Sequence, residues 1–439
     1  MTAKYPNLHN FFYLAGSGLA AQLLSTVYRI WLAQRIGATG LGIFSMTYPV
    51  YRLLSSIAAL GLPFALTKWT AEYLTVGEFH EIGLLKKWAV RVVSFLSLGV
   101  AATLYLGASF LSCHLFSDPR VKEALVIIAP AIPFSALSAI YRGYYQGFSR
   151  MAPTAVSEVA EQIAETGVTA FGLTCLIAVL PLASYSYPVI GLTIGEIVCL
   201  TTLLSFRESS RPACLSPSAT TGPPPYLEIL HYSRPLLLNQ IIVAISNAGE
   251  GVLIPQLLIR AGQTTAASTQ WLGYLNGMAA PLAYFPLILL FPLGMVLSPQ
   301  ISSGFKENSL ALLRAKVRRF YGATALIAIV CFQIIFLAAP WLAQTLYHNS
   351  LPVALIKILV IGMPFTAVSI INFTILAAIG ASDKVLTISL WAIGLKTALI
   401  FLAASHGIAG AAWAIAITQV FSALSGALEL RPFFIKLDA

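Results

Sequence analysis

The chain has 439 residues, of which 58% are hydrophobic and only 10% are charged, and its mean hydropathy is +0.82. Soluble domains carry about 25% charged residues, so this composition argues against a soluble protein and indicates a membrane protein with many spans. The net charge of +10 does not indicate nucleic-acid binding, because no basic run is interleaved with exposed aromatic residues. An excess of Lys and Arg is typical of the cytoplasmic loops of membrane proteins.

A helix needs about 20 mostly apolar residues to cross a bilayer, and about twelve segments meet this requirement. We therefore expect an all-α, polytopic fold. The predicted transmembrane helices cover residues 9–34, 41–65, 88–112, 121–147, 154–180, 186–206, 227–258, 270–302, 319–346, 352–379, 385–405 and 408–430. Internal prolines such as Pro49, Pro133 and Pro364 predict kinked helices, which favour a moving transporter over a passive scaffold.

The distribution of positive charge predicts the orientation of these helices. If the N-terminus lies inside, 18 of the 26 Lys and Arg residues fall on inner loops and flanks. The other eight are Arg29, Arg35, Arg52, Arg120, Lys122, Arg260, Lys357 and Lys396. This bias predicts a multi-pass protein of the cytoplasmic membrane with both termini in the cytoplasm.

A polar segment with five prolines, RESSRPACLSPSATTGPPP (residues 207–225), divides the chain near its middle. We expect an N-terminal six-helix lobe (1–206), a cytoplasmic linker (207–226) and a C-terminal six-helix lobe (227–439). IPFSALSAI from Ile132 is similar to MPFTAVSII from Met363, and Pro63 and Pro292 match at nearly the same separation. The two lobes are therefore predicted to be copies related by an axis along the membrane normal, with a substrate site between them.

No arrangement of residues indicates catalysis. The sequence has no nucleophile elbow, phosphate-binding loop or zinc-protease motif. Its five cysteines and six histidines are scattered, and no two cysteines form a CxxC pair. We therefore expect neither an enzyme nor a resident metal or cofactor.

Arginines inside apolar segments are the first candidate site residues. Arg29 lies about 9 Å inside the end of its helix and Arg52 about 15 Å deep, at 1.5 Å per residue. An intramembrane arginine costs about 2.5–3.5 kcal/mol at a helix centre, and its planar fork suits phosphate oxygens. Arg29 and Arg52 therefore predict an anion-binding cavity. The alternatives are that each arginine snorkels to the outer surface or pairs with a glutamate. Arg260 ends the equivalent helix of the second half and is a cavity residue or an interfacial one.

Buried acids form the second group of candidates. Glu158, Glu161 and Glu165 fall on one helical face, and Pro153 opens that helix. The first two suit a helix cap, whereas Glu165 lies deep enough to reach a cavity. Glu196 and Glu250 are isolated inside apolar spans. For Glu165, Glu196 and Glu250, ion coupling and internal pairing with an arginine both remain open.

Three stretches together resemble one known family. They are GATGLGIFSMTYPVY with GLPFALTKWTAEY (residues 37–73), RGYYQGFSRMAPTAVSEVAEQ (142–162) and LGYLNGMAAPLAYFPLILLFPLGMVLSPQIS (272–302). The chain is similar to the stage V sporulation protein B and polysaccharide-biosynthesis group. This group belongs to the superfamily of multidrug, oligosaccharidyl-lipid and polysaccharide exporters.

This resemblance implies a two-lobed, V-shaped MATE-like bundle that works by alternating access. The implied substrate is a peptidoglycan precursor or polysaccharide unit on a polyprenyl diphosphate, flipped from the inner to the outer leaflet. In related flippases, arginines on the first two helices meet the diphosphate, and Arg29 and Arg52 lie on the corresponding helices. Arg260 is added by its equivalent position. The expected partners are this lipid, bilayer lipids and H⁺ or Na⁺, and the expected state is a monomer.

Two other functions are compatible with the sequence. A cation-coupled multidrug exporter would need an acidic cavity, which Glu165, Glu196 and Glu250 could supply, although Arg29 and Arg52 oppose it. A non-transporting scaffold for envelope assembly would favour long soluble segments, and the longest polar stretch is residues 207–225.

Overall fold

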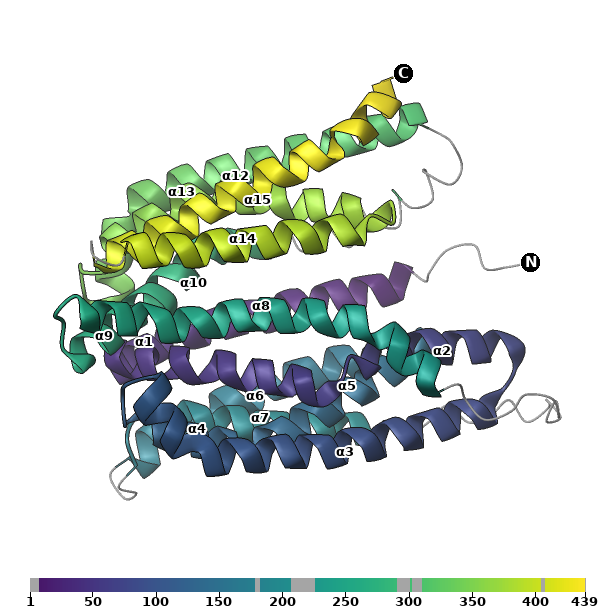
Figure 1. The fold of residues 1–439 in the computed structure, drawn as a ribbon, viewed down its shortest axis with the longest axis horizontal. Helices are drawn as coiled ribbons and strands as arrows, with labels where there is room; N and C mark the ends of the chain where they lie inside the picture. The colour runs from purple at the N-terminus through teal and green to yellow at the C-terminus, as the bar shows by residue number, and fades with distance from the viewer. Residues whose placement is uncertain are drawn as a thin grey trace. The chain divides into compact units, whose positions relative to one another are not determined.

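The computed structural model describes residues 8–177, 182–206, 226–289, 301, 310–403 and 407–438. Every regular element in these ranges is a helix, as predicted (Figure 1). The first half contains α1 (Leu8–Ala59), α2 (Leu62–Val76), α3 (Phe79–Phe110), η1 (Leu111–Leu115), α4 (Val121–Ile128), α5 (Ala131–Gly147), α6 (Ala152–Phe171), η2 (Gly172–Leu176) and α7 (Ser186–Ser205). The second half contains α8 (Tyr226–Arg260), α9 (Thr265–Leu272), η3 (Gly273–Ala279), α10 (Ala280–Tyr284), η4 (Phe285–Leu289), α12 (Leu310–Tyr347), α13 (Val353–Ala378), α14 (Ser382–Ala403) and α15 (Ile408–Asp438).

The twelve predicted segments fall on these helices wherever the chain is described. The linker predicted at 207–226, apart from Tyr226, lies outside the described residues, as do residues 290–300 of the eighth segment. By length and composition, seven described helices could cross a membrane, or nine if each of two bent helix pairs forms one span. This number is lower than the twelve predicted spans partly because of α6. Its 20 residues include Glu158, Glu161 and Glu165, and they are too charged to count as a membrane span.

A kink explains how α1 contains two predicted spans. The helix is 52 residues long, and Gly37 at its interior has φ 67° and ψ −178°. A residue with a Cβ atom rarely adopts a positive φ, whereas glycine does so readily. Gly37 therefore separates the predicted spans 9–34 and 41–65 without a loop.

The chain forms two compact units, each built from both halves of the sequence. Unit 1 comprises Met1–Ser25 and Met46–Gly249, and unit 2 comprises Thr26–Ser45 and Glu250–Ala439. The middle of α1 thus belongs with the second half of the chain, and the first two-thirds of α8 belongs with the first half. The lobes predicted at 1–206 and 227–439 stay a prediction, and the units differ from them in these two segments.

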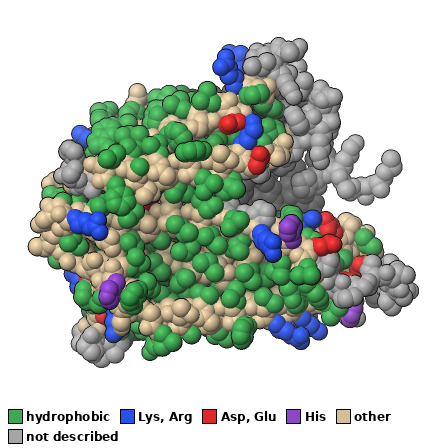
Figure 2. All heavy atoms as spheres, in the orientation of Figure 1, with side chains coloured by type: hydrophobic (Ala, Val, Ile, Leu, Met, Phe, Trp, Pro, Cys, Tyr) green, Lys and Arg blue, Asp and Glu red, His purple; other side chains and the backbone are tan. Residues whose placement is uncertain are grey.

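The surface of the described residues has the character expected of a protein in lipid. Hydrophobic side chains cover most of the face in view in Figure 2, and charged ones are few. Large apolar side chains such as Phe95, Leu106 and Leu337 are each more than three-quarters exposed. Patches of this extent are rare on soluble monomers, whereas lipid tails solvate them, so the pattern agrees with many membrane spans.

Within unit 2, the segment of α1 that follows Gly37 packs directly against η3. A Cβ atom at Gly273 would lie 1.7 Å from the Ala38 carbonyl oxygen and 2.9 Å from the Gly42 nitrogen. The obstacle is backbone on both sides, so no side-chain movement could relieve it. Glycine at this position is therefore required for the two segments to meet.

We expect Gly273→Ala to lower the midpoint of thermal unfolding in detergent, because overpacking typically costs about 1–3 kcal/mol. Gly99→Ala in α3 is the matched control, since no atom lies within 4 Å of its new Cβ atom. Alanine also favours a helix over glycine, so the control midpoint should hold or rise. Equal midpoints for the two variants would contradict this packing.

Candidate functional site

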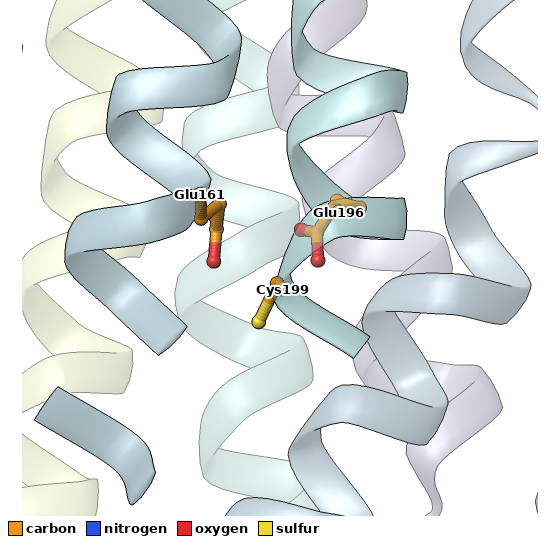
Figure 3. A group of neighbouring side chains, drawn as sticks. All are labelled: Glu161, Glu196 and Cys199. Carbon is orange, nitrogen blue, oxygen red and sulfur yellow. The ribbon is translucent and has the colours of Figure 1, made fainter. Parts of the chain in front are cut away.

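A cluster of charged and polar side chains lies in unit 1, where helices α5, α6 and α7 pack together. Its members are Tyr51 from α1, Arg142 from α5, Glu161 from α6, and Glu196 and Cys199 from α7. Figure 3 shows Glu161 on one helix directed toward Glu196 and Cys199 on the next. Glu196 and Cys199 are three residues apart and therefore lie on one face of α7.

The local sequence explains why α6 presents its acids to this cluster. Pro153 stands in the first turn of the helix, where its fixed φ and missing N–H are tolerated. Glu158, Glu161 and Glu165 follow at helical spacing on one face. The sequence predicted caps at Glu158 and Glu161, but the structure brings Glu161 into an ion pair with another helix.

Arg142 is the cation at the centre of the cluster. Its Nη2 donates to Glu161 Oε2 at 2.6 Å and lies 2.9 Å from Cys199 Sγ. The Arg142 and Glu161 side chains are 25% and 28% exposed, so the pair is largely withdrawn from solvent. The sequence placed Arg142 at an inner helix end and gave it no role. The one available signal was an arginine within an apolar span, the same signal that singled out Arg29.

Three side chains of the cluster could act as metal ligands, but the positive charge of Arg142 already lies beside them. One oxygen of Glu161, one of Glu196 and the Cys199 sulfur lie within 4.8 Å of one another. Two carboxylates and a thiol could bind a soft divalent cation. However, the Arg142 guanidinium contacts two of these three donors, so a metal ion would have to displace it and meet its repulsion.

Glu196 has a different environment from Glu161. Its exposed fraction is 6%. The Tyr51 hydroxyl donates to its Oε1 atom, and Ser135 contributes a second side-chain hydrogen bond. Within the described part of the chain, Glu196 forms no ion pair. Its role in ion coupling stays a prediction. Its hydrogen-bond partners are neutral, and the charges of Glu161 and Arg142 also act on it.

Arg52 follows Tyr51 in α1 and extends from the edge of this cluster. Its side chain is exposed, and the carboxylates of Glu161 and Glu196 attract it. No acidic group of the described residues lies within ion-pair distance of it. Arg52 is therefore a cation near two acids but not neutralised by direct contact with either.

The other two predicted arginines, Arg29 and Arg260, belong to unit 2. Arg29 lies on α1, Arg260 is the last residue of α8, and both side chains are exposed. Neither forms an ion pair with a residue that the structure describes. They occupy matching positions of the two halves, since the separation that relates Ile132 to Met363 also relates Arg29 to Arg260. Their role in diphosphate binding stays a prediction.

The remaining predicted acids, Glu165 and Glu250, lie in different units. Glu165 is half-buried on α6, and its carbonyl oxygen accepts a hydrogen bond from the Thr169 hydroxyl at 2.7 Å. Glu250, on α8, forms an ion pair with Lys396 of α14 at 2.5 Å, with both side chains 15% exposed. Lys396 was not predicted to have a role, and the same repeat separation makes it the counterpart of Glu165. At this repeat position, one half of the chain has an acid and the other has a base.

Comparison with known proteins shows what the chain is similar to. The family model described as "Polysaccharide biosynthesis protein" matches residues 7–305. The chain is 26% identical to stage V sporulation protein B of Bacillus subtilis (strain 168), over 99% of this chain and 86% of that protein. It is 24% identical to the lipid II flippase MurJ of the same organism, over 71% of this chain and 60% of that protein.

Solved structures share the fold. An inward-facing multidrug resistance MATE family transporter of the MOP superfamily aligns over 97% of this chain and 99% of its own, with TM-score 0.75 and 14% identity. A MOP superfamily transporter from Pyrococcus furiosus Vc1 (DSM3638) aligns over 98% and 96%, with TM-score 0.70 and 12% identity. The predicted MATE-like fold is thus confirmed, and the comparisons agree with a multi-pass membrane transporter rather than an enzyme.

The ion pair in unit 2 generates a test of stability. We expect Lys396→Met to lower the free energy of unfolding by about 3–5 kcal/mol, because it leaves the Glu250 carboxylate buried without a counter-charge. Adding Glu250→Gln should recover most of this loss. Unfolding in detergent, followed by tryptophan fluorescence, measures both effects.

Lys384→Met provides the control for this test. Lys384 of α14 forms an ion pair with Glu429 of α15 at 2.8 Å, so this pair also joins two helices. Its side chains are 43% and 44% exposed, unlike those of the buried pair. Its loss should change the unfolding midpoint little. A double variant as unstable as Lys396→Met alone would show that the buried pair is not the source of the stability.

Proposed function

This chain belongs to the polysaccharide biosynthesis protein family, and we propose that it is a flippase for a polyprenyl-diphosphate-linked saccharide. It would move this lipid from the inner to the outer leaflet by alternating access, for the synthesis of cell wall, spore cortex or polysaccharide. The named relatives support this class of substrate, since one is a lipid II flippase and another a sporulation protein.

The observation that carries the proposal is a contrast among the intramembrane cations. Arg142 and Lys396 are each joined to a glutamate of the same unit. Arg29 and Arg52 are exposed, and neither has an ion-pair partner in the described ranges. Since an uncompensated charge within a bilayer is costly, these two arginines favour an anionic ligand. A diphosphate offers oxygens that match the fork of each guanidinium.

A second function has its own supporting observation. The acids Glu158, Glu161 and Glu196 gather in unit 1, and an acidic site would suit a cation-coupled multidrug exporter. Several proteins with this fold are multidrug transporters. The cluster is less favourable to an organic cation than its acids alone imply, because Arg142 already neutralises Glu161.

The proposal includes the arrangement in the cytoplasmic membrane. We infer that both termini lie in the cytoplasm, from the bias of 18 inner to eight other Lys and Arg residues. The transported lipid and the bilayer lipids are the proposed partners, and the proposed state is a monomer.

Native mass spectrometry of the detergent-purified protein with an undecaprenyl-diphosphate saccharide tests the function. We expect the wild type to retain the lipid. The double variant Arg29→Ala, Arg52→Ala should retain it at least about tenfold less, since each hydrogen bond to a charged group contributes roughly 1.5–3 kcal/mol.

Arg91→Ala serves as the control variant, because Arg91 is an exposed cation on α3 of unit 1. Its retention of the lipid should equal that of the wild type. Equal retention by wild type and double variant would refute diphosphate binding by the two arginines. Retention of organic cations in place of the lipid would favour the drug-exporter function.

A further inference from the structure

A pocket of about 460 Å³ lies between α6, η2 and α7 of unit 1 and shares no residue with the cluster around Arg142. Its lining includes Gly167 and Phe171 of α6, Leu176 of η2, and Tyr187, Ile190 and Ile194 of α7. Among the described lining residues, Tyr187 alone has a polar side-chain atom, and this hydroxyl is buried. An occupant therefore meets apolar side chains, in a volume typical of pockets that hold a small ligand.

The sequence of α6 creates this space at Gly167. Ile163 and Phe171 lie one turn before and one turn after it, and their side chains are 57% and 58% exposed. A Cβ atom at Gly167 would have no heavy atom within 4 Å. Because residues four apart lie on one face of a helix, the apolar ridge along this face has a gap between Ile163 and Phe171.

Close glycine contacts prevent α6 and α7 from closing this gap. A Cβ atom at Gly191 would lie 2.2 Å from the Thr169 Oγ1 atom, and one at Gly172 would lie 2.4 Å from the Tyr187 ring. The two helices are therefore already as near to each other as their atoms allow. Since folded proteins leave few voids larger than a water molecule, we expect a ligand to fill the gap.

The pocket opens onto the apolar surface of unit 1. Gly167 and Phe171 are exposed, as is Ile177 beyond the end of η2. The adjoining helix α7 is long and apolar enough to cross a membrane, so bilayer lipid would lie directly against this opening. Because the pocket is continuous with the lipid-facing surface, a hydrocarbon chain is the group that can enter it from the bilayer.

Polarity changes along the pocket in the same order as along a bilayer lipid. The end at Tyr187 adjoins Tyr185 and Ser186, whose hydroxyls both donate to Glu123. Ile194 lies at the apolar end, about 10 Å from Tyr187 at 1.5 Å per residue. This length fits within one leaflet of a hydrocarbon core that is about 30 Å thick.

The charge at the polar end distinguishes between the lipids that could bind. Glu123 is the charged side chain that accepts hydrogen bonds from this end of the pocket, and the nearby Arg120 is already paired with Asp118 at 2.7 Å. The Glu123 carboxylate repels a diphosphate, which carries more than one negative charge, and attracts the ammonium group of a phospholipid such as phosphatidylethanolamine. The pocket therefore favours a phospholipid over a polyprenyl diphosphate.

We propose that this pocket binds one acyl chain of a bilayer phospholipid, whose headgroup lies at the Tyr187 end. The chain lies in the gap at Gly167 and against Ile190 and Ile194 of α7. The inference does not depend on the proposed function, because this phospholipid stays with the protein and is not the transported lipid. A ligand that binds only the folded state also stabilises that state.

Photocrosslinking in lipid nanodiscs tests this site. The full-length protein is reconstituted with a phosphatidylethanolamine that carries a diazirine in one acyl chain, and mass spectrometry locates the label after illumination. In the wild type we expect label on the residues of the pocket. Gly167→Leu should reduce this label about tenfold, because losing the burial of about two methylene groups changes a binding constant by that factor.

Gly99→Leu in α3 is the matched control, since Gly99 is also exposed and a Cβ atom there also meets no atom within 4 Å. It should leave the label in the pocket unchanged. Leucine favours a helix over glycine, so both variants should unfold at a temperature no lower than the wild type. A lower label in a correctly folded Gly167→Leu protein thus reports the filled pocket.

Several outcomes would overturn the inference. They are a wild type without label in the pocket, and equal label in the wild type and Gly167→Leu. A polyprenyl diphosphate with the same photoreactive group forms a second arm, and preferential labelling by it would assign the pocket to the transported lipid instead. A dimer that is present in the wild type and lost in Gly167→Leu would assign the pocket to a second copy of the chain. The proposed function is tested separately, by lipid retention in the double variant Arg29→Ala, Arg52→Ala.

Discussion

The cost of an ionised side chain in a bilayer governs how this chain uses its few charges. Arg142 is neutralised by an ion pair with Glu161, and Lys396 is neutralised by an ion pair with Glu250. Each pair lies within one compact unit. These internal pairs hold helices together and leave no net charge behind. Arg29, Arg52 and Glu196 have no such pair among the described residues. A transporter of charged ligands needs charges without an internal partner, and the paired charges stabilise the helices on which they lie.

The cluster around Arg142 also shows why composition alone misleads about the chemistry of a site. Two glutamates and a cysteine at close spacing suggest a metal, and the same residues with a guanidinium between them form a neutralised network. The guanidinium is covalently attached and always charged, so it cannot be exchanged during a transport cycle. Arg142 therefore neutralises Glu161 by direct contact, whereas Glu196 is held by hydroxyl donors.

Hydropathy was sufficient to predict the helices and the all-α class of fold, because these depend on residues close in sequence. The partners of the buried acids could not be predicted. Glu161 meets an arginine 19 residues away, Tyr51 meets Glu196 across 145 residues, and Glu250 meets Lys396 across 146. Helical spacing shows which face an acid occupies but not which helix that face meets. Gly37 falls in the gap between two predicted spans, but hydropathy did not show that this gap is a kink within one helix.

The exchange of segments between the two units affects how the protein is made. Thr26–Ser45 leave the ribosome early, yet they pack with η3, which is synthesised only after the whole first half of the chain. The first two-thirds of α8 completes unit 1, so that unit is also unfinished when the ribosome passes residue 206. Each half of the polypeptide thus lacks a segment of the compact unit to which most of it belongs. During biosynthesis the early helices are in the membrane before the segments that complete their packing have been made. A gene divided within residues 207–225 would yield two fragments, each lacking a segment of its compact unit.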